Sequence, residues 1–334
     1  MNLVDSTLNG SRRAIARLLT MVENESDGIN QAIADLFPHT GNAWIIGITG
    51  APGTGKSSLV NALAKTYRRN GKSVGIIAVD PTSPFSGGAI LGDRIRMRDL
   101  SGDSGVFIRS MATRGSLGGL ARATRDAIRV LDAAGFDVIL VETVGAGQSE
   151  VDIVRTAQTT IVVEAPGLGD DIQAIKAGIL EIADILVVNK ADRTGAQNTV
   201  RALRAMLEMG HPVARTQIIS HHGQLMQAET AQTTDADSSQ WIPAVVETVA
   251  IEDTGINALA DAIETHHAHL NEHGVMKQLE QQRVQLELYE RLRETLIIDL
   301  LEDTPVKLMA NIIERILRRE LDPQSAVRII LGKK

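Results

Sequence analysis

A short glycine-rich segment constrains the fold of this 334-residue chain more than any other feature. Its letters, GAPGTGKS from Gly50 to Ser57, fit the pattern G-x-x-x-x-G-K-[ST]. The apolar run WIIGIT precedes it, and a segment with helical spacing follows. In that setting the glycines let the backbone curl around phosphates, and the helix N-terminus adds partial positive charge. The segment therefore predicts a strand, a phosphate-binding loop and a helix, in that order.

Two side chains at the end of this loop have predicted roles. Lys56 is expected to reach the β- and γ-phosphates of a nucleotide, and the Ser57 hydroxyl to ligate Mg²⁺. The nucleotide-binding residues predicted from the loop are Gly50, Ala51, Pro52, Gly53, Thr54, Gly55, Lys56, Ser57 and Ser58. The alternative is a glycine-rich turn between a strand and a helix that binds no ligand.

Short apolar runs alternate with longer amphipathic segments from residue 44 to residue 249. Continuous apolar runs suit strands buried on both faces, as in a parallel sheet flanked by helices. The expected strands are 44–49, 73–79, 105–110, 137–143, 159–165, 184–190 and 243–249. Helices are expected near 56–70, 116–134, 170–180 and 196–209. The pattern predicts an α/β fold with a doubly wound, mainly parallel sheet.

Helical spacing predicts further helices on both sides of this region, including two that start at Pro305 and Pro323. We therefore expect an N-terminal helical segment at 1–41, a nucleotide-binding domain at 42–255 and a C-terminal helical arm at 256–334. The polar stretch 227–240 is predicted to be a surface loop or the end of a helix.

Composition excludes several classes of function. The net charge is −7 and no long basic run appears, which argues against nucleic-acid binding. No stretch approaches the roughly 20 apolar residues that a membrane helix needs, and the N-terminus lacks the pattern of a secretory signal. The chain has no cysteine, which excludes disulfides, thiolate metal sites and cysteine nucleophiles. This fits a reducing compartment, and we expect a cytoplasmic protein without membrane contact.

A second motif, N-K-x-D, predicts recognition of the nucleotide base. Asn189, Lys190 and Asp192 follow the apolar run ILVV. A carboxylate at Asp192 can accept hydrogen bonds from guanine N1–H and the 2-amino group together, whereas adenine offers neither donor. The Lys190 stem can cover the face of the base. The alternative is an ordinary turn at the end of a strand.

The next strand ends at a further candidate contact with the base. In the segment ETVA, a backbone N–H is expected to face guanine O6. We therefore extend the nucleotide site to Thr248, Val249 and Ala250.

Two acids after the second strand are candidates for the metal site. Asp80 lies at the strand end, where doubly wound sheets place ligand-binding groups. Asp93 follows thirteen residues later, and both carboxylates are expected to reach Mg²⁺ or its waters. Alternatively, Asp80 caps the turn before Pro81, and Asp93 forms a surface pair with Arg94 or Arg96.

The segment Glu142-Thr143-Val144-Gly145 has the spacing of the D-x-x-G motif found in nucleotide switches, but its acid is one methylene longer. The Gly145 N–H is expected to contact the γ-phosphate. Ala146 follows Gly145, so the glutamine that commonly positions the attacking water is missing at that place. The pattern predicts a slow phosphate-sensing switch. Among the arginines Arg94, Arg96, Arg98, Arg109 and Arg114, one is a candidate for stabilising charge in the transition state; solvation or structural pairing is the alternative.

Together these motifs resemble the MeaB/ArgK family of P-loop GTPases, the bacterial relatives of the human methylmalonic aciduria type A protein. The resemblance rests on GAPGTGKSSL, DPTSPFSGGAILGDRIRM, FIRSMATRGSLGGLA, ILVETVGAGQSEVDI, PGLGDDIQAIKAGI and VVNKAD, in that order. These blocks cover residues 44–192 closely. The second and third blocks are not general GTPase features, so the match is specific.

The resemblance implies a P-loop GTPase domain that uses GTP, GDP and Mg²⁺ and turns over slowly without a partner. Family members are chaperones of adenosylcobalamin-dependent acyl-CoA mutases, and they gate cobalamin loading and protect or rescue the mutase. Methylmalonyl-CoA mutase is the default partner, and isobutyryl-type or hydroxyacyl-type mutases, which use close relatives, are the alternatives. The implied catalytic residues are Lys56, Asp80, Asp93, Glu142 and Gly145, and the implied metal ligands are Ser57, Asp80, Asp93 and Glu142.

The resemblance also implies a mobile loop at Gly167–Lys176 and a homodimer formed by the C-terminal arm. The arm carries an apolar stripe of Leu279, Val284, Leu286, Leu288, Leu292, Leu296 and Ile297, for which internal packing is the alternative.

Two other functions remain open. One is assembly of a nickel-type metallocentre, to which the paired histidines at 221–222 and 266–269 would contribute; without cysteine or a nearby acidic set, we expect those histidines to be solvated. The other is a nucleotide-dependent kinase or transport ATPase, against which N-K-x-D argues.

Overall fold

The computed structural model describes residues 2–80, 97–100, 102–112, 119–143, 153, 155–167, 182–209 and 241–332. The chain divides into two compact units, Met1–Gln278 and Leu279–Lys334, and each is described by itself.

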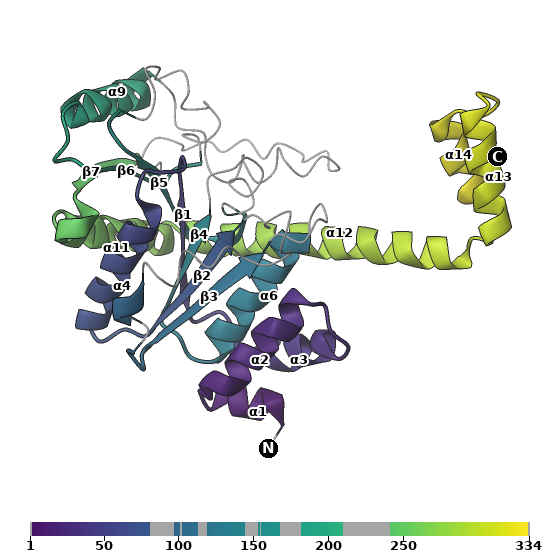
Figure 1. Cartoon of the computed structure of the whole chain (residues 1–334), viewed down its shortest axis with the longest axis horizontal. Helices are drawn as coiled ribbons and strands as arrows, with labels where there is room; N and C mark the ends of the chain where they lie inside the picture. The colour runs from purple at the N-terminus through teal and green to yellow at the C-terminus, as the bar shows by residue number, and fades with distance from the viewer. Residues whose placement is uncertain are drawn as a thin grey trace. The chain divides into compact units, whose positions relative to one another are not determined.

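A seven-stranded sheet forms the centre of the first unit (Figure 1). Its order is β3-β2-β4-β1-β5-β6-β7, and every pairing between neighbours is parallel. The strands are β1 (Trp44–Thr49), β2 (Val74–Asp80), β3 (Val106–Ala112), β4 (Val138–Thr143), β5 (Thr159–Glu164), β6 (Ile185–Asn189) and β7 (Ala244–Thr248). All seven predicted strands are present, and the predicted doubly wound parallel sheet is confirmed.

Helices cover both faces of this sheet, as Figure 1 shows. One face packs against α4 (Lys56–Arg69) and α11 (Ile256–Glu272). The other face packs against α6 (Gly119–Ala133) and α9 (Ala196–Met209). The inner strand β4 is buried at all six positions, which explains why its sequence is a continuous apolar run and not an alternating one.

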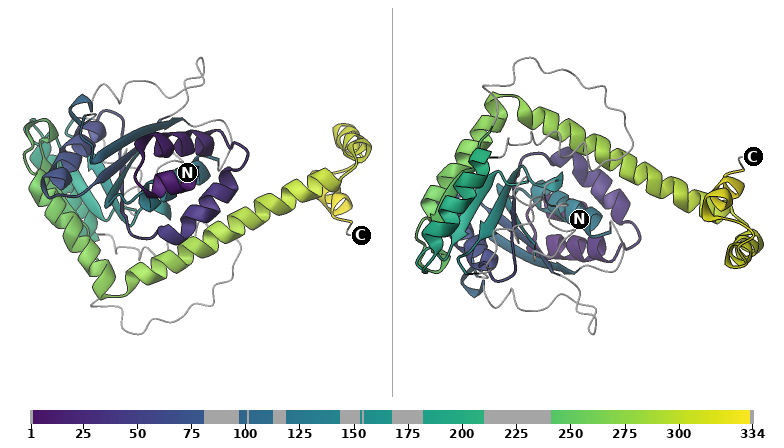
Figure 2. Two further views of the ribbon diagram at one scale, coloured as in Figure 1. Left: turned by 90° about the horizontal axis from the view of Figure 1, so that it is seen from below. Right: turned by 90° about the horizontal axis from the view of Figure 1, so that it is seen from above.

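Three N-terminal helices pack beside α6 (Figure 2). They are α1 (Leu3–Leu8), α2 (Arg12–Glu23) and α3 (Ile29–Leu36). The helical spacing of α2 buries Ile15, Leu18 and Leu19 in the same core as α6. The predicted N-terminal helical segment therefore packs on the sheet domain through an apolar face.

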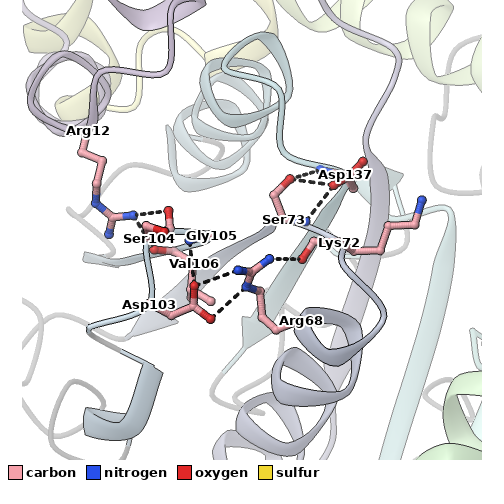
Figure 3. A network of polar contacts seen from close by, with 9 residues as sticks. All are labelled: Arg12, Arg68, Lys72, Ser73, Asp103, Ser104, Gly105, Val106 and Asp137. Carbon is pink, nitrogen blue, oxygen red and sulfur yellow. Dashed lines mark hydrogen bonds and ion pairs between the residues drawn. The ribbon is translucent and has the colours of Figure 1, made fainter.

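Polar contacts fix α2 and α4 to the end of the sheet where β2, β3 and β4 begin (Figure 3). Arg12 donates to the carbonyl oxygens of Ser104 and Val106, at 3.1 and 2.7 Å. Arg68 of α4 donates two hydrogen bonds of 2.9 Å to Asp103. This edge is opposite the carboxyl ends of the strands, so the network is structural.

The carboxyl ends of the strands bring the predicted motifs to one edge. Because all strands are parallel, β1, β2, β4, β6 and β7 finish on the same side of the sheet. Their last residues are Thr49, Asp80, Thr143, Asn189 and Thr248. The phosphate loop, the first metal acid, the switch motif, N-K-x-D and the ETVA segment each lie at one of these ends, as expected for ligand sites in doubly wound folds.

The second unit is helical. It contains α12 (Val275–Asp303) from Leu279 onward, α13 (Val306–Leu317) and α14 (Pro323–Ile330). Between α13 and α14, Ile312 and Ala326 are buried. Many large apolar side chains of α12 are exposed, namely Val284, Leu288, Tyr289, Leu292, Leu296, Ile297, Ile298 and Leu301. Within the described part of the chain, no helix combines the length and apolarity needed to cross a membrane.

Candidate nucleotide-binding site

The phosphate loop lies between β1 and α4, as its sequence predicts. Gly50 and Gly55 both have left-handed backbone angles, with φ of +139° and +94°. A Cβ at Gly50 would collide with the carbonyl oxygen of Val163 on β5, and one at Gly55 would collide with the Asn189 side chain. At both positions glycine is therefore required for two reasons, the positive φ of the backbone and the close approach of a neighbouring atom.

Lys56 lies inside its own loop. Its side chain is 6% exposed, and Nζ donates to the carbonyl oxygens of Gly50 and Ala51 at 2.7 and 3.0 Å. The ammonium group is thus held among backbone dipoles at the start of α4. This is where the sequence places a cation for nucleotide phosphates.

A hydrogen bond explains the longer acid in the switch motif. The Ser57 hydroxyl donates to Glu142 Oε1 at 2.6 Å, and both residues are buried. Glu142 pairs with Ile48 in the parallel ladder of β4 and β1, so its side chain crosses from β4 to the first turn of α4. Mg²⁺ prefers hard oxygen donors such as a hydroxyl and a carboxylate. The chemistry of this pair fits a magnesium site.

Other parts of the predicted metal site are only partly described. Asp80 is the last residue of β2, next to the end of β4, as expected. The Asp80 side chain and the whole of Asp93 lie outside the described residues, as do Gly145 and most of the loop at 167–176. The expected helix at 170–180 and the polar segment 227–240 also lie outside them.

Asn189 joins three parts of the site. Its side chain is 2% exposed, and Nδ2 donates to the Thr54 carbonyl oxygen at 2.9 Å. Its Oδ1 accepts from the Thr248 hydroxyl and from the Ala250 N–H, both at 3.1 Å. The phosphate loop, the N-K-x-D turn and the end of β7 are therefore linked by one buried amide.

The remaining residues of the base-recognition motif surround this amide. Lys190 has a φ of +57°, and its Nζ donates to the Gly53 carbonyl oxygen at 2.7 Å. Asp192 is exposed, so its carboxylate is accessible at the surface beside the loop. Val249 is buried just before η4 (Ala250–Glu252). A backbone N–H of this segment is expected to face guanine O6; that of Ala250 donates to Asn189 and can reach a second acceptor only as a shared donor.

One prediction about the histidines is wrong. His266 is 1% exposed, with Nδ1 3.0 Å from the Thr159 hydroxyl and Nε2 3.4 Å from Asp184 Oδ1. It lies on the inner face of α11 with Ile263 and Leu270, where helical spacing brings it against the sheet. His267 stacks on Trp44, and burial lowers its pKa. Among the described residues, no group of three or more His, Asp or Glu side chains is arranged to hold a metal ion.

One of the five candidate arginines has a structural role. Arg109 of β3 forms a largely buried ion pair with Glu23 of α2. Arg94, Arg96 and Arg114, and the side chain of Arg98, lie outside the described residues.

Two contacts in this site were not predicted from the sequence. One is the hydrogen bond from Asn189 to the Thr54 carbonyl oxygen, which links two loops. The other is the hydrogen bond between the Thr49 and Thr143 hydroxyls. The N-K-x-D motif and the strand ends could be recognised in the sequence. The hydrogen-bond partners of Asn189 and Thr143 depend on the order of the strands in the sheet, which the sequence pattern does not reveal.

A parallel sheet with a phosphate loop after β1 and N-K-x-D after β6 defines a P-loop nucleotide-binding protein with a guanine-type base motif. The family model described as "Methylmalonyl Co-A mutase-associated GTPase MeaB" matches residues 15–304. The chain belongs to this MeaB family of GTPases.

Comparisons with individual proteins agree. A putative GTPase of Pyrococcus abyssi is 47% identical over 98% of this chain and 95% of its own length. The mitochondrial methylmalonic aciduria type A homolog of Caenorhabditis elegans is 37% identical over 57% of this chain and 51% of its own length. The solved structure of a LAO/AO transport system kinase has a TM-score of 0.67 at 24% identity, covering 99% of this chain and 95% of that one. This last similarity concerns the fold alone.

Proposed function

We propose that this chain binds GTP and hydrolyses it to GDP and phosphate. The observation that carries the proposal is the set of hydrogen bonds at Asn189, which joins the phosphate loop to the base-recognition turn. A site built in this way couples recognition of the base to placement of the phosphates. Asp192 is the proposed acceptor for guanine N1–H and the 2-amino group, with Lys190 over the face of the base.

We propose that Ser57 ligates Mg²⁺ on the nucleotide, with Asp80, Asp93 and Glu142 as the acids around the metal and its waters. Bound Mg²⁺ supplies charge neutralisation at the β- and γ-phosphates. The contact between Ser57 and Glu142 supports this, because a serine hydroxyl that donates its hydrogen to a carboxylate keeps its lone pairs for a cation. Glu142 then orients Ser57 and has no need to touch the metal itself.

In the proposed reaction, water attacks the γ-phosphorus while the bond to the β–γ bridging oxygen breaks. Lys56 and the Gly145 N–H stabilise charge on the phosphate oxygens, so positioning and electrostatics provide most of the catalysis. Ala146 carries no group to orient the attacking water. Hydrolysis is therefore slow until a partner completes the site.

Fluorescent nucleotide titration tests this proposal. We expect GDP and GTP to bind at least about 100-fold more tightly than ADP and ATP, because a site built around hydrogen-bond donors of the base rejects a base that lacks them. Phosphate release should require GTP and Mg²⁺. Equal affinity for the adenine nucleotides would favour the kinase or ATPase alternative.

We further propose that the chain is a G-protein chaperone of an adenosylcobalamin-dependent acyl-CoA mutase, with methylmalonyl-CoA mutase the first candidate. Membership of a family described as associated with that mutase supports this. GTP orders the switch loops, hydrolysis relaxes them, and the change alters contacts with the mutase and gates cobalamin loading. Turnover measured with and without saturating mutase tests the idea. An unchanged rate would remove its main support.

We also propose that the C-terminal arm forms a homodimer. Leu288 and Leu292 are 63% and 50% exposed, one helical turn apart on α12, and exposed apolar stripes of this kind seek a partner. The double change Leu288→Glu/Leu292→Glu should give monomers in light scattering, whereas Arg293→Glu, at an exposed polar position of α12 that helical spacing places away from the face shared by Leu288 and Leu292, should leave a dimer. A Leu288→Glu/Leu292→Glu variant that is still a dimer would contradict the proposal. The cytoplasmic location and the boundaries at 41/42 and 255/256 stay predictions.

A further inference from the structure

A pair of buried threonine hydroxyls joins the ends of β1 and β4. Thr143 Oγ1 donates to Thr49 Oγ1 at 2.9 Å. Thr49 is fully buried, and Thr143 is 3% exposed. Neither residue belongs to the phosphate loop or to the predicted metal ligands. Each lies beside a residue that does, since Thr49 precedes Gly50 and Thr143 follows Glu142.

The last two residues of β4 form hydrogen bonds at the two ends of the phosphate loop, from opposite faces of the sheet. Successive side chains of a strand point to opposite faces. Glu142 accepts from Ser57 on the face covered by α4, where Ile48 and Leu140 are buried. Thr143 therefore points to the face covered by α6, where Val141 is buried, and there it donates to Thr49. One strand end thus holds the loop where it begins and where it ends.

The beginning of the loop is also held from its other side. In the sheet order, β1 lies between β4 and β5. Gly50 lies so close to the Val163 carbonyl oxygen of β5 that no Cβ would fit. The loop therefore starts at a point fixed by backbone contact with β5 and by the threonine bond to β4. Because both hydroxyls are buried, water cannot readily replace the lost bond if one of them is removed.

We infer that Thr143 is a positioning residue for GTP hydrolysis, acting through Thr49. This inference rests on the proposed function. Gly145, whose N–H is the expected contact of the γ-phosphate, follows Thr143 by two residues in the sequence, and the bond to Thr49 fixes the point at which the chain leaves β4 toward it. GDP has no γ-phosphate. Loss of the bond should therefore slow hydrolysis and weaken GTP binding while leaving GDP binding nearly unchanged.

Four variants test this: Thr143→Val, Thr49→Val, the double valine variant and Thr143→Ser. Valine keeps the shape of threonine and removes the hydroxyl. We expect each single valine variant to lower the single-turnover rate of GTP hydrolysis about 3- to 10-fold, the range for one buried neutral hydrogen bond. The Kd for GDP should stay within about twofold of wild type, because no contact to GDP is lost. Thr143→Ser keeps the donor and should restore the rate.

The double variant separates positioning from general stability. Replacing both partners of a buried hydrogen bond by apolar groups is nearly neutral for folding, so its melting temperature should return toward wild type. Its hydrolysis rate should stay low, because the link between the strands is still missing. A rate that recovers together with the melting temperature would overturn the inference, as would an unchanged rate in Thr143→Val or equal losses of GDP and GTP affinity. Absence of GTP binding and hydrolysis in wild type would instead overturn the proposed function, and the inference with it.

Discussion

Removal of the Asn189 side chain tests the link between the two halves of the nucleotide site. Asn189→Ala deletes three buried hydrogen bonds, to the Thr54 carbonyl, the Thr248 hydroxyl and the Ala250 N–H. At about 0.5–1.5 kcal/mol for each bond, the free energy of unfolding should fall by about 1.5–4.5 kcal/mol. The affinity for GDP should also fall, because the phosphate loop and the base-recognition turn lose their shared contact.

Urea unfolding measures the change in the free energy of unfolding, and titration with GDP in the absence of urea measures the change in affinity. The matched control is Asn198→Ala on α9, an exposed asparagine whose Oδ1 accepts a hydrogen bond from Arg201 at the surface. Its unfolding free energy should change by no more than about 0.5 kcal/mol. If Asn189→Ala is as stable as this control, the buried amide does not hold the loops together and the reasoning is refuted.

Three further predictions concern other contacts. Glu142→Gln should keep GDP binding and weaken Mg²⁺-dependent turnover, because an amide is a poorer acceptor for the Ser57 hydroxyl; normal metal dependence in an enzymatic assay would show that the acid is dispensable. His266→Ala should lower the free energy of unfolding by about 1–3 kcal/mol, since its buried polar partners Thr159 and Asp184 lose this contact, and urea unfolding with the exposed His39→Ala as control measures this. The hydrogen bond from Arg68, with a backbone bond from Gly105, lowers the pKa of Asp103 below its ordinary 3.8, so this contribution to stability is full above pH 3.8 and is lost as pH falls through the folded-state value. Asp103→Asn should therefore have a lower free energy of unfolding than wild type near neutral pH, and the difference should shrink in acid. Urea unfolding at a series of pH values measures this, and a difference that does not change with pH would contradict it.

The strands and the phosphate loop could be predicted from the sequence because each depends on local pattern. The apolar run before Gly50 becomes β1, and the helix expected from residue 56 starts at Lys56. Strands buried on both faces must be apolar throughout, so β4 was visible in the sequence without knowledge of its neighbours. The same local logic placed N-K-x-D at the end of β6.

The contacts that give these motifs their geometry depend on strand order, which no local pattern contains. Ser57 meets Glu142 only because β1 and β4 are neighbours in parallel register, and the same is true of Thr49 and Thr143. The wrong prediction that His266 is solvated has a different origin. The spacing of His266 from Ile263 and Leu270 already indicated the inner face of α11. The polar ring can be buried on that face because Thr159 and Asp184 provide partners for its two nitrogens.

The central claim is that this chain recognises guanine through Asp192, and one measurement tests it directly. Asparagine at this position replaces one acceptor oxygen by an amide donor, which complements the 2-carbonyl oxygen of xanthine in place of the 2-amino group of guanine.

The affinities of wild type and Asp192→Asn for GDP and xanthosine diphosphate are measured by the same fluorescent titration. Asp192 is exposed, so the folded state should tolerate the change, and a melting curve checks this. We predict that wild type prefers GDP and that the variant prefers the xanthine nucleotide. A folded variant that keeps wild-type affinity for GDP and still rejects xanthosine diphosphate would contradict the account.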